Sequence, residues 1–173
     1  MTKLETIEKS IKYRGTFLHH VSILEAYLNL YIANYFIGQQ NPNKMAELQE
    51  VILGDERFSF NSTVQVFKHL AQKYDEEWYN SYKSLRPHDL KNKPHLLNAD
   101  LIHIVENRNI FAHRILENYE RDIFEKSKPD GAIRFVRLKD EAIPVDFTDD
   151  SFSLLIRLIS FISMFIIERC KKR

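Results

Sequence analysis

The sequence predicts an all-α fold, a bundle of five to six helices with a small β-hairpin near the C-terminus. Apolar residues recur at spacings of three and four over long stretches, which is typical of amphipathic helices. The four glycines and five prolines fall almost entirely between those stretches. The chain has 173 residues, so we expect one domain over residues 1–173, with a helical core over about 3–118.

The apolar spacing divides this core into five helices. The first covers about residues 3–36, and a short helix follows at about 43–53. A capping box at 62–65 opens the third helix, and 75–85 contains a further short one. The next long helix covers about 95–118. The apolar stripe expected to face the core from the first helix is Leu4, Ile7, Ile11, Leu18, Val21, Leu28, Ile32 and Tyr35.

The C-terminal part is expected to contain a hairpin at about 132–147 and a helix at about 149–171. A Pro-Asp-Gly turn precedes the hairpin, whose strands are predicted at 133–138 and 142–147. Thr148 is placed to cap the last helix, with aspartates in its first turn. The apolar run of this helix is short for a membrane span and is interrupted by an arginine, so we interpret it as a core helix.

Composition excludes several classes of protein. Hydrophobic residues make up 44% and charged residues 28%, which is neither a disordered nor a membrane composition. The net charge of +1 provides no global attraction to nucleic acid, so any such contact needs a local patch. The lone Cys170 and the charged N-terminus, which lacks an apolar signal segment, predict a cytoplasmic protein without a membrane anchor. The histidine spacing predicts no metal site, and we expect no cofactor.

One segment of the predicted 95–118 helix combines residues suited to chemistry on phosphates. Asn109 and His113 are four residues apart and therefore share one helix face. Arg108 lies some 140° around the helix from His113, but its side chain is long. Together they offer a cation for phosphate, an amide for orientation and an imidazole for proton transfer, the capabilities that metal-free RNA cleavage needs.

These residues resemble the HEPN superfamily, whose signature is an arginine, a polar residue, a few spacers and a histidine on a late helix of an α-bundle. Arg108, Asn109 and His113 match that signature residue for residue. The resemblance covers roughly residues 10–118. It implies a homodimer that brings two motif helices together, so that both copies of His113 line one cleft.

The resemblance also implies an activity, metal-independent RNA cleavage by the ribose 2′-OH that leaves a 2′,3′-cyclic phosphate. His113 would act as general base or acid, and Arg108 would stabilise charge in the transition state. Asn109 would orient His113 or the phosphate, with Glu25 and Glu106 in supporting roles. A toxin or phage-defence protein, with an antitoxin or another protein partner, would fit this activity.

A structural role for the same residues is also open. Arg108 occupies a position in the apolar stripe of its helix, and Glu25 interrupts the stripe of the first helix. Because an unpartnered buried charge is costly, we expect Glu25 and Arg108 to approach each other, with Arg14 competing for Glu25. Such a pair would not exclude catalysis, since it could orient the guanidinium. His113 in turn could be a packed or surface histidine.

The segment before the motif helix mixes basic and aromatic residues, as single-stranded RNA-binding surfaces do. The alternative is a solvated loop with aromatic rings in the core. The residues that could contact RNA, together with one from the motif helix, are Tyr82, Lys83, Arg86, Lys91, Lys93 and Arg114.

Two other functions remain open. One is a non-catalytic HEPN-like interaction module that resembles the mannitol operon repressor, which a His113 buried away from any cleft would favour. The other is a purely structural helical subunit, which saturated intramolecular partners for Arg108 and His113 would indicate.

Overall fold

The computed structural model describes residues 1–38, 41–55, 59–88, 92–117, 128–136 and 144–172. In this part of the chain the fold is mostly helical, as predicted, with one small sheet. The helices are α1 (Lys3–Ile37), α2 (Pro42–Glu47), the π-helical segment η1 (Leu48–Leu53), α3 (Phe60–Tyr74), α4 (Glu76–Asn80), α5 (Leu97–His113) and α6 (Asp149–Lys171). The strands are β1 (Ile115–Leu116), β2 (Ile133–Val136) and β3 (Val145–Phe147).

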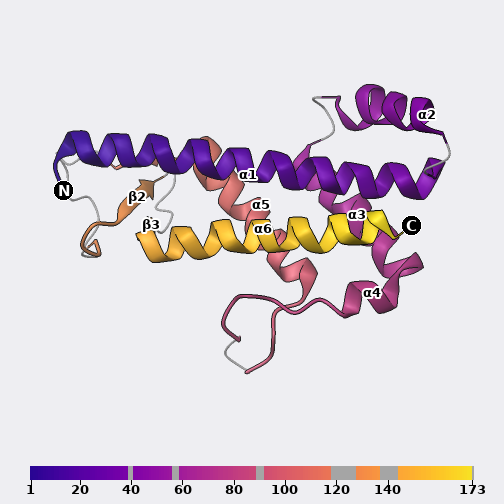
Figure 1. The fold of residues 1–173 in the computed structure, drawn as a ribbon. Coiled ribbons are helices and arrows are strands. Elements are labelled where there is room, and N and C mark those ends of the chain that lie inside the picture. The colour runs from indigo at the N-terminus through magenta and orange to yellow at the C-terminus, as the bar shows by residue number, and fades with distance from the viewer. Residues whose placement is uncertain (39–40, 56–58, 89–91, 118–127, 137–143, 173) are drawn as a thin grey trace.

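Helices α1 and α6 lie side by side along the molecule and run in the same direction (Figure 1). Helix α5 packs against α1, α3 and α6, and the sheet lies at the end of the bundle where α1 begins. Helix α1 starts with a capping box between Thr2 and Glu5, which satisfies backbone N–H groups that have no partner inside the helix. It ends at Gly38, whose φ of 71° suits glycine.

The predicted core stripe of α1 is wrong in its first half. Leu4 and Ile11 are 65% and 64% exposed, and Ile7 and Leu18 also face solvent. Larger aromatic side chains occupy the core face instead. Tyr13 stacks on Phe152 of α6 with ring centroids 3.7 Å apart, and Phe17 is fully buried. The second half of the stripe is buried at Val21, Leu28 and Ile32.

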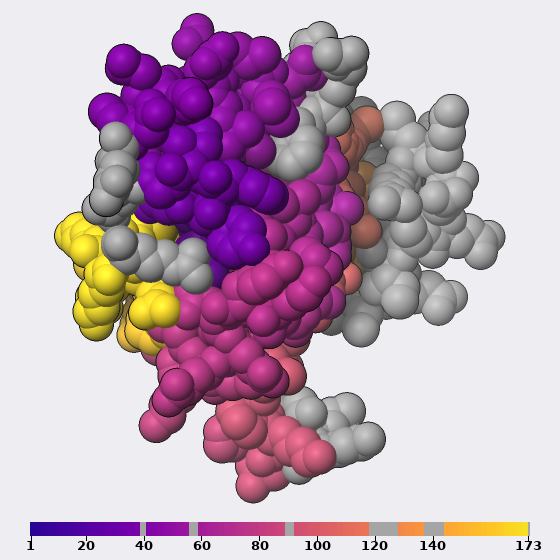
Figure 2. All heavy atoms as spheres, turned by 90° about the vertical axis from the view of Figure 1, so that its right-hand side faces the viewer, coloured from indigo at the N-terminus to yellow at the C-terminus, as the bar shows by residue number. Residues whose placement is uncertain are grey.

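The predicted third helix begins earlier than expected. Its cap is Ser59, whose hydroxyl accepts a hydrogen bond from the backbone N–H of Ser62. The capping box predicted at 62–65 therefore lies inside the helix. The helix predicted within 75–85 is confined to the single short turn of α4. The described residues between α4 and α5, 81–88 and 92–96, project from the body of the molecule in two views (Figures 1 and 2).

The motif helix ends at His113, five residues before the predicted end. Arg114 has an extended backbone, and the next two residues form β1. Strand β2 pairs antiparallel with β3, as the predicted hairpin requires, and the unpredicted β1 adds a third strand on the other edge of β2. Within that sheet Arg134 is 2% exposed, and it donates two hydrogen bonds, of 2.7 and 2.8 Å, to the facing Asp146. The predicted strand ends at 137–143 lie outside the described residues.

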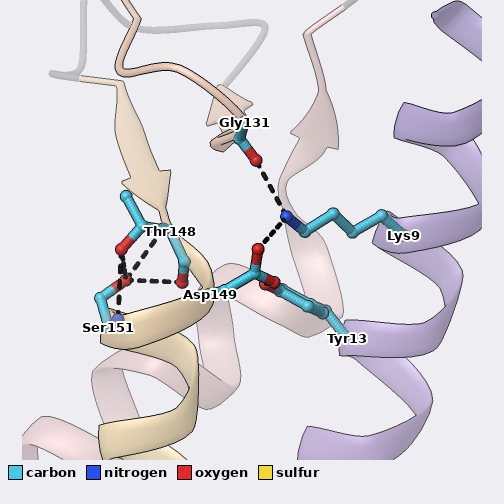
Figure 3. Close-up of polar contacts among 6 residues, drawn as sticks. All are labelled: Lys9, Tyr13, Gly131, Thr148, Asp149 and Ser151. Carbon is cyan, nitrogen blue, oxygen red and sulfur yellow. Dashed lines mark hydrogen bonds and ion pairs between the residues drawn. The ribbon is translucent and has the colours of Figure 1, made fainter. Parts of the chain in front are cut away.

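Helix α6 matches its prediction. Thr148 and Ser151 form a capping box, and Lys9 of α1 reaches both Asp149 and the carbonyl oxygen of Gly131 (Figure 3). One face of α6 is buried along α1. By length and composition alone, α6 is also long and apolar enough to cross a membrane. The buried residues of this face are Phe152, Leu155, Leu158, Ile159, Ile162, Ser163, Ile166 and Cys170.

Candidate functional site

The orientation of the motif helix is set by Phe111, which is fully buried. Its ring centroid lies 4.6 Å from that of Phe17 in α1 and 4.6 Å from that of Phe147 in β3. Because each residue turns an α-helix by about 100°, this inward ring places Asn109 and His113 on the outer face. Both side chains are exposed, whereas Arg108 is half-buried toward α1.

Polar contacts hold the first turn of α5 in place. Asp100 is fully buried and accepts hydrogen bonds from Tyr82 (2.7 Å) and Arg86 (3.1 Å). A carboxylate in the first turn of a helix is stabilised by the positive end of the helix dipole. Burial raises the pKa of Tyr82 well above its ordinary value, and the hydrogen bond to Asp100 adds to that rise. The loop before α5 is thus tied to the helix that carries the motif.

The other end of α5 is held by Arg14 of α1. Its guanidinium donates hydrogen bonds to the carbonyl oxygens of Phe111 and Arg114, and it lies over the ring of Phe135 at 4.7 Å. The last carbonyls of a helix lack intrahelical donors, so a cation is favourable there. Arg14 therefore fixes the end of the motif helix and, within the described residues, does not pair with Glu25 as the sequence suggested.

Arg108 lies in a polar cleft of about 390 Å³ between α1, η1 and the start of α3. Glu25, which was predicted to approach Arg108, lines the same cleft. Burial raises the pKa of the Glu25 carboxyl, and the nearby positive charge of Arg108 partly opposes that rise. The two charges therefore act on each other, yet the part of the chain that the structure describes records no hydrogen bond between them. The Arg108 guanidinium stays available to a ligand.

Sequence reasoning missed the other polar members of this cleft. Ser22 and Asn29 line its α1 wall beside Glu25, while Asp55 and Ser59 line the wall between η1 and α3. The signal was present, because residues 22, 25 and 29 follow the spacing of three and four that defines one helix face. The pattern was overlooked because only the apolar residues of the first helix were used to predict its faces.

The remaining motif residues lie elsewhere on α5. Asn109 and Glu106 line a second cleft of about 280 Å³ with Ile110 and Arg114. His113 is exposed and lines neither this cleft nor that of Arg108. One chain therefore does not bring Arg108, Asn109 and His113 into a single cleft.

The predicted RNA-contacting residues are divided between core and surface. Tyr82 is 7% exposed and packs against Phe165, so its ring belongs to the core and is closed to a base. Arg86 is committed to Asp100. Lys83 and Lys93 are exposed, Arg114 is half-buried, and the position of the remaining lysine, Lys91, lies outside the described residues.

Within the described residues, no group of three or more histidine, cysteine, aspartate or glutamate side chains could hold a metal ion. Cys170, the single cysteine of the chain, is buried near the end of α6. The chemistry in this part of the chain therefore centres on the Arg108 cleft and the exposed outer face of α5.

The fold and the site define a mostly helical protein whose half-buried arginine faces a polar cleft beside an exposed Asn-His face. Comparisons with protein-family models, curated proteins and solved structures found no match to this chain.

Proposed function

We propose that this protein is a metal-independent endoribonuclease of the HEPN type, active in the cytoplasm as a homodimer. The observation that carries the proposal is the state of Arg108, which lies in a polar cleft with no hydrogen-bond partner among the described residues. His113, on the same helix, is exposed and makes no hydrogen bond in that part of the chain. A purely structural role would commit these side chains to intramolecular partners. A toxin or phage-defence role, with an antitoxin as partner, fits such an enzyme.

The reaction is an attack by the ribose 2′-oxygen on the adjacent phosphorus. The new bond joins the 2′-oxygen to phosphorus, and the bond from phosphorus to the 5′-oxygen breaks. One histidine accepts the proton of the 2′-OH, and a second donor protonates the leaving 5′-oxygen. Arg108 offsets the extra negative charge on the phosphorane-like transition state, and Asn109 orients the phosphate or the imidazole. The products are a 2′,3′-cyclic phosphate and a 5′-OH.

A second subunit completes the site in this account. Arg108 and His113 face different directions in one chain, so the partner's His113 is the group that joins Arg108 at the phosphate. Leu4, Ile7, Ile11 and Leu18, here called the α1 stripe, support a dimer because large apolar side chains exposed in a row mark association surfaces. The stripe continues along the same helix face to Glu25 in the cleft.

A non-catalytic interaction module is the second candidate. Two observations favour it, the α1 stripe and the position of His113 outside the Arg108 cleft. Such a module, similar in kind to the mannitol operon repressor, would use the stripe to bind another protein and would have no activity on RNA.

Cleavage of a mixed RNA pool, with EDTA present, separates the two candidates. The wild type is expected to leave 2′,3′-cyclic phosphate ends, and His113→Ala is expected to lose at least about a hundredfold in rate, since acid–base groups contribute about 10²–10⁴. His69→Ala in α3 is the matched control. If a well-folded wild type, freed of co-purifying partners, cleaves none of several RNAs, the interaction module is the better account.

A further inference from the structure

The α1 wall of the Arg108 cleft presents hydrogen-bond acceptors. Ser22 donates its hydroxyl hydrogen to the carbonyl oxygen of Leu18 at 3.0 Å, which leaves only lone pairs for a ligand. Glu25 contributes a carboxylate. The Asn29 Oδ1 atom is buried and has no hydrogen-bond partner among the described residues. At 1.5 Å per residue, these three positions form a row about 10 Å long.

Among the described residues, Arg108 is the charged donor of the cleft. Arg108 supplies the guanidinium, Asp55 adds a second carboxylate after η1, and the hydroxyl of Ser59 is engaged with Ser62 at the start of α3. Glu25 is half-buried in this cleft, so a ligand that covers its carboxylate without supplying donors leaves the acceptors unpaired at a cost. A ligand that fits must bring N–H groups to α1 and negative charge to Arg108.

A guanine nucleotide carries that pattern. Its ring presents N1–H and N2–H₂ as adjacent donors, which a carboxylate can accept together, and a phosphate is attached to the same nucleotide. Adenine and cytosine each place a ring-nitrogen acceptor beside their amino group, and that acceptor would face the carboxylate. Uracil offers one N–H between two carbonyl oxygens. Guanine is therefore the RNA base that best satisfies this wall.

We propose that the cleft binds the guanine base of an RNA nucleotide, with Glu25 and Asn29 on its N1–H and N2–H₂ groups and Arg108 on its phosphate. The choice of RNA as the ligand rests on the proposed function. The cleft volume of about 390 Å³ falls within the range of small-molecule sites. Cleavage by the enzyme would then occur beside guanosine.

The test is a calorimetric titration of the protein with GMP, AMP, CMP and UMP, which needs no turnover. GMP is expected to bind at least about tenfold more tightly than the others, since a good bidentate pair discriminates between bases by about this factor or more. Glu25→Gln, which keeps the size of the side chain, is expected to lose that preference. Glu77→Gln, at an exposed position of α4, is the matched control and should keep it.

Asn29→Leu is a second variant, which keeps the test valid if Glu25→Gln fails to fold. Thermal melts of each variant check that it is folded. Asn29→Leu is expected to weaken GMP binding while the weaker binding of UMP stays unchanged. Equal binding of all four nucleotides, binding of none, or an unchanged GMP preference in Glu25→Gln would overturn the proposal.

The proposed function can fail separately from this inference. Selective GMP binding without RNA cleavage would contradict the nuclease activity and support the guanine site. Cleavage with no preference for guanosine at any position next to the cut would support the nuclease activity and overturn the guanine site.

Discussion

Asp149 shows how single residues tie the ends of this fold together. It accepts hydrogen bonds from Lys9 at 2.8 Å and from Tyr13, both on α1, while it begins α6 (Figure 3). The hydrogen bonds from Lys9 and Tyr13 lower the pKa of Asp149. Burial and the bond to Asp149 raise the pKa of Tyr13 above its ordinary value, so the phenol stays a donor at neutral pH.

Asp149→Asn should therefore change the acid stability of the protein. Because the aspartate pKa is lower in the folded chain, its stabilisation is fully present above the unfolded value of about 3.9 and is lost as pH falls through the folded value. Asp149 is exposed, so we expect a loss of less than about 1 kcal/mol at pH 7, shrinking toward zero near pH 2. Urea unfolding across this pH range measures it. An equal, pH-dependent loss in Asp150→Asn would contradict the account.

At the residue scale, sequence reasoning identified Arg108 and Glu25 but not the partners of Arg14. A charge inside an apolar stripe signals a need for compensation, and the two residues predicted to approach each other, Glu25 and Arg108, line one cleft without a hydrogen bond between them in the described part of the chain. Arg14 carried the same signal, but its partners are backbone carbonyls at the end of α5. Those carbonyls become available only because the helix stops at His113, which depends on the pairing of β1 with β2.

At the element scale, the position of α5 depends on its two tethered ends. Tyr82→Phe removes the hydrogen bond to buried Asp100, and we expect a loss of about 1–3 kcal/mol in the free energy of unfolding. Tyr74→Phe, at a tyrosine that is 51% exposed, is the control and should cost little. Urea denaturation of both variants provides the comparison. If Tyr82→Phe kept full stability but lost RNA binding, the Tyr82 hydroxyl would serve an RNA contact and not the anchoring of α5.

The sequence predicted where the long helices lie better than it predicted which faces are buried and where the helices end. Apolar periodicity and capping signals located α1, α5 and α6, since both depend on local sequence. The inward face of α1 depends on which aromatic rings meet across the bundle, as Phe17 meets Phe111, and that is a tertiary property. The end of α5 at His113 likewise depends on a strand partner about twenty residues further along the chain.

At the scale of the whole molecule, the α1 stripe is the feature that a single chain leaves unexplained. Four large apolar side chains along one helix are exposed to water, and burying one of them is worth about 1.5–3 kcal/mol. The proposed dimer would cover this stripe. Glu8 and Lys12 lie one turn apart beside it, so antiparallel contact between two copies would place opposite charges together.

Ile11→Glu should therefore weaken the dimer. Placing a charge in the centre of an apolar contact is expected to raise the dimer dissociation constant at least about tenfold. Sedimentation equilibrium of the wild type and the variant measures it, with Met164→Glu on the exposed face of α6 as control. A wild type that stays monomeric at all concentrations, or an Ile11→Glu variant with an unchanged dissociation constant, would rule out this surface.

The central claim is that Arg108 of one subunit and His113 of the other share one active site. The most direct measurement mixes equal amounts of Arg108→Ala and His113→Ala, each inactive alone, allows subunit exchange and assays RNA cleavage. A shared site predicts recovery to about a quarter of the wild-type rate, because half of the dimers are mixed and each has one intact site of two. A mixture no more active than the separate variants, while wild-type controls exchange and cleave, would contradict the claim.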